Sequence, residues 1–131
     1  MPPQEPRQVL PTVELEIVEA IDAAIVKLRG EHDFTTKPSI REALTQAAAR
    51  APRVVVDLSE CTFADSSLVQ VLVEARARFR VDGVVIEVVI PPAATAVRRL
   101  AQLVSLAEIL PVYESRVAAI DNGPAQREVL S

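Results

Sequence analysis

The chain has 131 residues, of which 50% are hydrophobic but only 3% aromatic, and its formal net charge is -4. This length suffices for one domain with a buried core, which the scarcity of aromatic residues restricts mainly to Val, Leu, Ile and Ala. The acidic balance weighs against a nucleic-acid or anionic membrane surface, and the single cysteine excludes an internal disulfide.

The ends of the chain differ in composition from its middle. Residues 1–12 contain four prolines, so we expect a flexible segment there, followed by a domain at residues 13–121 and a short tail at residues 122–131. No apolar run approaches the roughly 18 residues of a membrane span, and the N-terminus lacks the pattern of a secretory signal. We therefore expect a cytoplasmic protein without a membrane span.

The domain begins with two predicted strands. Polar and apolar residues alternate from Glu14 to Glu19, which predicts a half-exposed edge strand. Ala23–Arg29 predicts a second strand that pairs with the first as a hairpin. The polar segment Gly30–Asp33 then predicts a loop, in which we expect His32 to be exposed.

A helix is predicted next, ending at about Arg50 before Pro52. Thr36 or Ser39 could cap it, and the spacing from Ser39 to Glu42 is that of a capping box. Its predicted apolar face consists of Ile40, Leu44, Ala47 and Ala48.

The apolar run Val54–Leu58 predicts a third strand, central in its sheet. A polar loop follows, and then a helix over about Ser66–Arg80. Its predicted apolar stripe consists of Leu68, Val71, Leu72, Ala75 and Phe79.

The remainder continues the alternation of strands and helices. It predicts a strand over Val84–Ile90, a helix over about Ala94–Val104, a strand over Ile109–Tyr113 and a helix over Glu114–Ile120. Such alternation favours a largely parallel sheet covered by helices. We therefore expect an α/β fold, a mixed sheet of four to five strands with about four helices.

Several kinds of chemistry find no support in the residues. Three glycines cannot form a phosphate-cradling loop, and one histidine with one cysteine cannot make a structural zinc site. A hydrolase triad with His32 lacks a serine in a nucleophile elbow, and Cys61 lacks a basic neighbour in sequence. We therefore expect no enzyme, no cofactor and no metal.

Two separated motifs resemble those of the STAS domain family, the sulfate-transporter and anti-sigma-factor-antagonist domain. Val54–Ser67 closely resembles the family signature, and Leu28–Asp33 resembles its Leu-x-Gly-Glu-Leu-Asp motif, with His32 in place of an apolar residue. Pro92–Leu100 matches the family's third helix. The resemblance covers about Glu14–Ala119 and implies the STAS fold.

Similarity to stand-alone members implies a bacterial anti-sigma factor antagonist that works by partner switching. Such an antagonist binds an anti-sigma factor that is also a serine kinase, and thereby releases a sigma factor for transcription. The kinase phosphorylates the first serine after the signature aspartate, here Ser66, and a phosphatase resets the switch. The implied partner-binding residues are Asp65, Ser66, Ser67, Leu68, Gly30, Glu31 and Asp33.

The residues give this switch a physical basis. Asp65 is a good N-cap, which would place Ser66 and Ser67 in the first helical turn with hydroxyls near the surface. Phosphate adds roughly -1.5 to -2 charges, which a helix N-terminus tolerates but a closely apposed partner does not. Where the family commonly has glycine, this chain has Leu68, whose side chain we expect to add bulk to the contact surface.

Other interpretations remain open. Ser66 could be an unmodified helix-capping serine, and Gly30, Glu31 and Asp33 could form only a tight turn and a helix cap. The chain could also be a STAS interaction module of another assembly, a stressosome-like scaffold or a lipid-transport complex, without phosphorylation. No motif supports a small-molecule or nucleotide binder.

Overall fold

The N-terminal part of the domain forms a hairpin at the edge of the sheet, as predicted. In the computed structural model, which describes residues 10–121, strand β1 (Thr12–Val18) pairs antiparallel with β2 (Ala23–His32). The turn between them contains the short 3-10 helix η1 (Glu19–Ile21) and Asp22, whose φ of 49° lies in the left-handed region. The side chains of β1 alternate between exposed and half-buried, which confirms the half-exposed edge strand.

Two segments predicted as polar loops are instead the ends of long strands. Strand β2 continues through Gly30 to His32, and β3 (Arg53–Ala64) continues past Leu58. Their parallel pairing contains register shifts at Lys27/Arg29 and at Gly30/Glu31. In β3 the alternation is lost past Leu58, where pairs of exposed residues follow one another while the backbones stay paired, so the segment imitates a loop. In β2 the alternation of exposed and buried residues continues to His32.

Helix α1 (Lys37–Arg50) begins earlier than the capping box predicted, directly after the 3-10 helix η2 (Phe34–Thr36). Pro38 lies in the first turn, where its fixed φ suits a helix, so Ser39 is already helical and the capping box is wrong. Thr36 occupies the N-cap position but makes no side-chain cap hydrogen bond. The predicted apolar face is confirmed: Ile40, Leu44 and Ala47 are buried, and Ala48 packs against the core.

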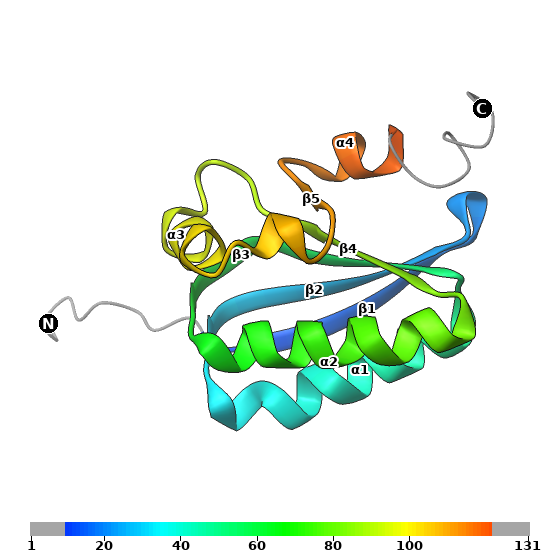
Figure 1. Ribbon diagram of the computed structural model, residues 1–131, viewed down its shortest axis with the longest axis horizontal. Coiled ribbons are helices and arrows are strands. Elements are labelled where there is room, and N and C mark those ends of the chain that lie inside the picture. The colour runs from blue at the N-terminus through cyan, green and yellow to red at the C-terminus, as the bar shows by residue number, and fades with distance from the viewer. Residues whose placement is uncertain (1–9, 122–131) are drawn as a thin grey trace, which may run out of the picture.

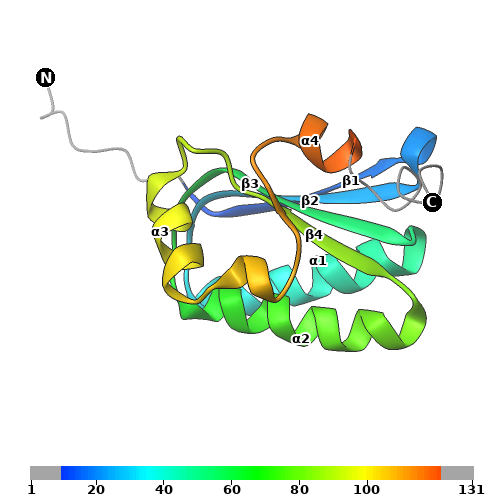
Figure 2. The ribbon, with the colours of Figure 1, turned by 45° about the horizontal axis from the view of Figure 1, so that its top comes forward.

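Helix α2 (Ser66–Asp82) buries all five residues of its predicted apolar stripe, Leu68, Val71, Leu72, Ala75 and Phe79. Gly83, with a φ of 71°, ends the helix before strand β4 (Val85–Val89). Figures 1 and 2 both show α1 and α2 side by side on one face of the sheet. This arrangement follows when successive parallel strands are added in one direction through crossovers of the same hand.

The last elements complete the predicted architecture. They are α3 (Thr95–Leu103), the 3-10 helix η3 (Leu106–Glu108), β5 (Val112–Tyr113) and α4 (Arg116–Asp121). In residues 10–121 the sheet has the order β1-β2-β3-β4-β5, with β3 at its centre and parallel pairing from β2 onward. The predicted mixed sheet of four to five strands with about four helices is thus confirmed.

The sheet has a core on each face. The larger core packs the sheet against α1, α2 and α3, and the smaller core joins Ile25, Val55 and Val89 to Ala119 of α4 on the opposite face (Figure 1). No helix within residues 10–121 is long and apolar enough to cross a membrane. The predicted tail at residues 122–131 and most of the predicted segment at residues 1–12 lie outside the described residues.

Candidate partner-binding site

The ends of β2 and β3 bring the two sequence motifs together. His32 pairs with Ala64 in the parallel ladder, and the Asp65 amide donates to the His32 carbonyl over 3.3 Å. The segments Gly30–Asp33 and Asp65–Leu68 therefore meet at one end of the sheet, although more than thirty residues separate them in sequence. This end is where β3 passes into α2.

Asp65 fixes the start of α2. Its backbone is extended, with a φ of -108°, and its Oδ1 accepts a hydrogen bond from the Ser67 amide over 2.8 Å. This is the geometry of an N-cap, as predicted, and it satisfies one of the free amides of the first turn. Ser66 is the first helical residue and is exposed, whereas Ser67 is half-buried.

Leu68 does not lie on the contact surface. Its side chain is only 3% exposed and belongs to the larger core, beside Leu58 and Leu72. Two residues along an α-helix correspond to a rotation of about 200°, so a chain in which Ser66 faces outward turns Leu68 inward. The expectation that Leu68 adds bulk to the surface is wrong.

The segment before α1 contributes two acidic side chains. Glu31 and Asp33 are both exposed, whereas Gly30 is buried and has a φ of 85° at the register shift of β2. The hydroxyl and amide of Thr35 both donate to the Asp33 carboxylate, and these hydrogen bonds lower the pKa of Asp33. Asp33 is thus a helix cap, for η2, and its carboxylate still faces solvent.

His32 is buried, so the prediction that it is exposed is wrong. The residue is only 1% exposed, with Nε2 3.0 Å from the Arg29 carbonyl and Nδ1 3.0 Å from Thr36 Oγ1. Because successive side chains of a strand alternate between faces, His32 points inward while Glu31 points outward. Burial lowers the pKa of His32, although its hydrogen bonds and the charge of Asp33 oppose that effect.

Sequence reasoning missed two exposed aromatic residues at this end. Phe34 is 72% exposed and begins η2, and Phe63 is 47% exposed and pairs with Glu31 in the ladder. Exposed rings of this kind are enriched at protein–protein interfaces. A signal was present, because two of the three phenylalanines stand in polar segments, where a core residue is not expected.

The single cysteine, Cys61, lies two residues before Phe63 in β3. Cys61 is buried, and its thiol donates to the Phe63 carbonyl over 3.3 Å. Burial raises the pKa of the Cys61 thiol to about 11. The thiol is therefore protonated at neutral pH and unsuited to act as a nucleophile.

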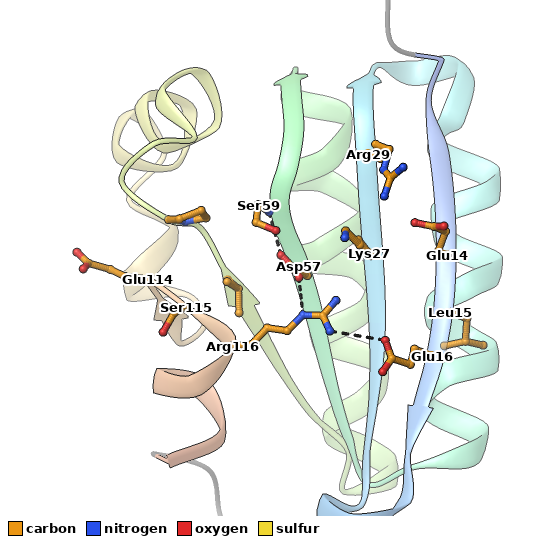
Figure 3. A pocket seen from close by; sticks show the side chains of 12 residues that line it. Glu14, Leu15, Glu16, Lys27, Arg29, Asp57, Ser59, Glu114, Ser115 and Arg116 are labelled. Atoms are coloured by element: carbon orange, nitrogen blue, oxygen red, sulfur yellow. Dashed lines mark hydrogen bonds and ion pairs between the residues drawn. The ribbon is translucent and has the colours of Figure 1, made fainter.

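A separate hollow of about 690 Å³ lies on the open face of the sheet, beside α4 (Figure 3). Arg116 reaches from α4 to Asp57 of β3, with Nε 2.6 Å from Oδ2, and also pairs with Glu16 of β1 (Figure 3). The other two cations that line the hollow, Lys27 and Arg29, both pair with Glu60.

The three cations that line the hollow are thus all paired with carboxylates. Arg116 fastens α4 to the sheet, which is a structural role. Within residues 10–121, no three His, Cys, Asp or Glu side chains are grouped so that they could hold a metal ion. The surface around Ser66 remains the candidate functional site.

Comparisons with known proteins agree with the fold. A family model described as "Mlab, STAS domain" matches residues 16–111. The crystal structure of an anti-sigma factor antagonist from Mycobacterium paratuberculosis is similar, with 26% identity, a TM-score of 0.75, and coverage of 90% of this chain and 95% of that one. A comparison with curated proteins finds no match.

Two structures of SpoIIAA show the same fold at lower identity. The unphosphorylated anti-sigma factor antagonist has 22% identity and a TM-score of 0.65, covering 84% of this chain and 94% of that one. The phosphorylated form of the Bacillus cell fate determinant has 19% identity and a TM-score of 0.60, covering 84% of this chain and 97% of that one.

Proposed function

The chain belongs to the STAS domain family, and we propose that it is an anti-sigma factor antagonist controlled by phosphorylation of Ser66. In this proposal the unphosphorylated protein binds an anti-sigma factor that is also a serine kinase, and so releases a sigma factor in the cytoplasm. Phosphorylation ends binding, and a phosphatase restores it. Similarity to the mycobacterial antagonist supports the proposal.

The observation that carries the proposal is the placement of Ser66. Its side chain is exposed at the first position of α2, on a backbone that the Asp65 cap holds in place. A hydroxyl at a fixed and exposed helix start can enter a kinase active site without unfolding of the domain. A phosphate there lies near the free amides of the first turn, which favour an anion by roughly 0.3–1 kcal/mol.

The surroundings of Ser66 explain how phosphate could abolish binding. We propose that the partner covers Ser66 together with Phe63, Phe34 and the carboxylates of Glu31 and Asp33. Removing water from an unpaired phosphate at such an interface costs several kcal/mol, and about 1.4 kcal/mol corresponds to a tenfold loss of affinity. The switch therefore needs no change of fold.

We propose that the protein acts by binding and is not an enzyme. The buried ring of His32 bonds to Thr36 and to Arg29, so it does not serve as a general base for Ser66. Cys61 is equally removed from solvent. These observations argue against the serine- or cysteine-based hydrolysis that the residue types alone would permit.

Phosphorylation can be tested by incubating the protein with ATP and each purified anti-sigma factor kinase of its own organism, followed by mass spectrometry. We expect phosphate on Ser66, none on a Ser66→Ala variant, and unchanged labelling of a Ser67→Ala variant. No phosphate, or phosphate only outside Ser66 and Ser67, would contradict the switch.

Binding is tested separately by calorimetry with the same kinases. We expect Ser66→Glu to weaken binding at least tenfold while its urea unfolding stays within about 1 kcal/mol of wild type, because the helix start accepts the charge. A Ser66→Glu variant that binds as tightly as wild type would contradict the electrostatic account even if Ser66 is phosphorylated.

A second candidate is an interaction module of another assembly, such as a stressosome-like scaffold or a lipid-transport complex, without phosphorylation. The observation that favours it is the matching family model, whose description names Mlab and not an anti-sigma factor antagonist. Purification of a stable complex from the native organism in which Ser66 carries no phosphate, with no anti-sigma factor present, would select this candidate.

A further inference from the structure

We propose that His32 is a positioning residue for the partner surface and that protonation of its ring redirects the hydrogen bonds that hold this surface. The inference rests on the proposed function, since it assigns a control to the same site. It concerns a side chain that is buried beneath the site and that the Ser66 switch does not use.

The ring nitrogens of His32 face two different kinds of partner. Nε2 lies 3.0 Å from the carbonyl oxygen of Arg29, which can only accept, so Nε2 carries a hydrogen. Nδ1 lies 3.0 Å from Oγ1 of Thr36, and a hydroxyl can either donate or accept. The surroundings therefore accommodate both the neutral and the charged ring.

The hydroxyl of Thr36 can serve both the neutral and the charged ring, because it has one hydrogen and two acceptors in reach. Its Oγ1 is 3.0 Å from His32 Nδ1 and 3.1 Å from the carbonyl oxygen of Asp33. With a neutral ring, the hydroxyl donates to Nδ1. With a charged ring, Nδ1 donates to Oγ1, and the hydroxyl hydrogen turns to the Asp33 carbonyl.

The redirected bond lies within the segment that carries the partner surface. The Thr36 amide also donates to the Asp33 carbonyl, over 3.2 Å, so protonation tightens the η2 turn that presents Phe34. On the other side, the His32 carbonyl accepts from the Asp65 amide at the cap of α2. His32 thus connects the two segments of the site.

The charged groups around the ring set the direction of the effect. The Asp33 carboxylate favours a charged ring, and so do the backbone of Thr12 in β1 and that of Arg29 in β2, which accept hydrogen bonds from the ring. The Thr36 hydroxyl of η2 faces Nδ1. Burial is the larger influence and lowers the pKa of His32. The ring is therefore neutral at neutral pH and becomes charged only below its ordinary pKa of about 6.5.

Because protonation rearranges the hydrogen bonds of the segment that presents Phe34, the affinity for the partner should differ between the two states of the ring. The difference is tenfold for each unit by which binding shifts the pKa of His32. The STAS motif commonly has an apolar residue at this position, which makes His32→Leu a suitable matched variant.

The test is an NMR pH titration of the isotope-labelled protein from pH 7.5 to 5. The chain has one histidine, so its ring signal needs no further assignment. We expect the amide signals of Thr36 and Asp65 to move with the same midpoint as the ring, and to stay constant in His32→Leu. If the ring does not titrate in this range, if it titrates while these amides do not move, or if they move equally in His32→Leu, the inference is wrong.

A second variant and a binding measurement complete the test. Thr36→Val removes the acceptor for the charged ring, so the ring should titrate at lower pH than in wild type; an unchanged or higher midpoint contradicts the hydrogen-bond exchange. Affinity for the anti-sigma kinase should change between pH 7.5 and 5.5 several-fold more in wild type than in His32→Leu. Absence of binding at both pH values counts against the proposed function, and the amide titration still decides the inference.

Discussion

At the scale of single residues, the four positions from Asp65 to Leu68 have different surroundings. Asp65 caps α2, Ser66 is exposed, Ser67 is half-buried, and Leu68 belongs to the core. Leu68 packs the first turn of α2 against the core, and Asp65 caps the N-terminal end of that turn. The presentation of Ser66 therefore depends on its neighbours more than on its own contacts.

Removal of the cap tests this dependence. Asp65→Ala should lower the free energy of unfolding by about 1 kcal/mol, because the Ser67 amide loses its acceptor. Asp65→Asn should lose clearly less, since asparagine is an equally good N-cap. Urea unfolding at neutral pH measures both variants, and equal losses would show that charge, not capping, is what Asp65 contributes.

Predictions for single residues were correct where the apolar residues followed one regular periodicity. The stripe of α2 followed the helical period, and this same period already placed Leu68 inward, in conflict with the expectation drawn from the family's glycine. His32 was misplaced because the predicted strand ended at Arg29. The alternation of β2 in fact continues from Leu28 to His32 and turns His32 inward, but a histidine among charged residues after a glycine imitates an exposed loop.

At the scale of elements, charged side chains fasten the short helix α4 to the sheet. Arg53 forms a buried ion pair with Glu87 and also donates to the Ala119 carbonyl in α4. Arg116 pairs with Asp57, whose side chain is 3% exposed. Because α4 has only 6 residues, its own backbone hydrogen bonds are too few to hold it, and these contacts replace them.

The Asp57–Arg116 pair predicts a dependence of stability on pH. Burial raises the pKa of Asp57, but hydrogen bonds from Ser59 and Arg116 outweigh burial and leave the pKa below its usual value. A carboxylate with a lowered pKa stabilises the fold above the unfolded pKa, about 3.9, and this contribution is lost as the pH falls through the lower folded value.

Asp57→Asn should therefore lower the free energy of unfolding by about 1.5–3 kcal/mol at pH 7 and by much less at pH 2, as urea unfolding would show. Glu60→Gln is the matched control, because the Glu60 side chain is 45% exposed and should matter little at either pH. An equal loss for Asp57→Asn at pH 7 and pH 2 would contradict the role of the ionised pair.

The order and type of the elements were predictable because each apolar run or stripe was long enough to identify. The strand ends were not, since Ser59–Ala64 contains the polar composition of a loop and is held in the sheet by pairing with β2. Likewise, Phe34 and Phe63 become recognisable as surface residues only when η2 and the end of β3 are in place.

At the scale of the whole molecule, the candidate site and the contacts that hold α4 lie in different regions. The candidate site lies at the carboxyl ends of the parallel strands β2 and β3, the edge where α/β folds commonly place their binding sites. The α4 contacts lie on the face opposite to α1 and α2 (Figure 2). Changes at one region should therefore leave the other largely unaffected.

We propose that the predicted domain, residues 13–121, folds on its own when it is extended to residue 10 so that β1 is complete. A chain restricted to residues 10–121 should unfold in urea within about 0.5 kcal/mol of the full chain. A chain restricted to residues 10–115 should unfold at a clearly lower urea concentration, because it lacks α4 and uncovers Ile25, Val55 and Val89. Equal stability of these two shortened chains would contradict the role given to α4.

The burial of Cys61 also makes the local opening of this end of the sheet measurable. An alkylating reagent reacts with thiolate, so labelling requires the ends of β2 and β3 to separate and admit solvent. With one thiol in the chain, the labelling rate under native conditions reports how often this local opening occurs. A partner seated on Phe63 would hold the strands closed, and slower labelling of the same thiol would then report the occupied fraction of the protein.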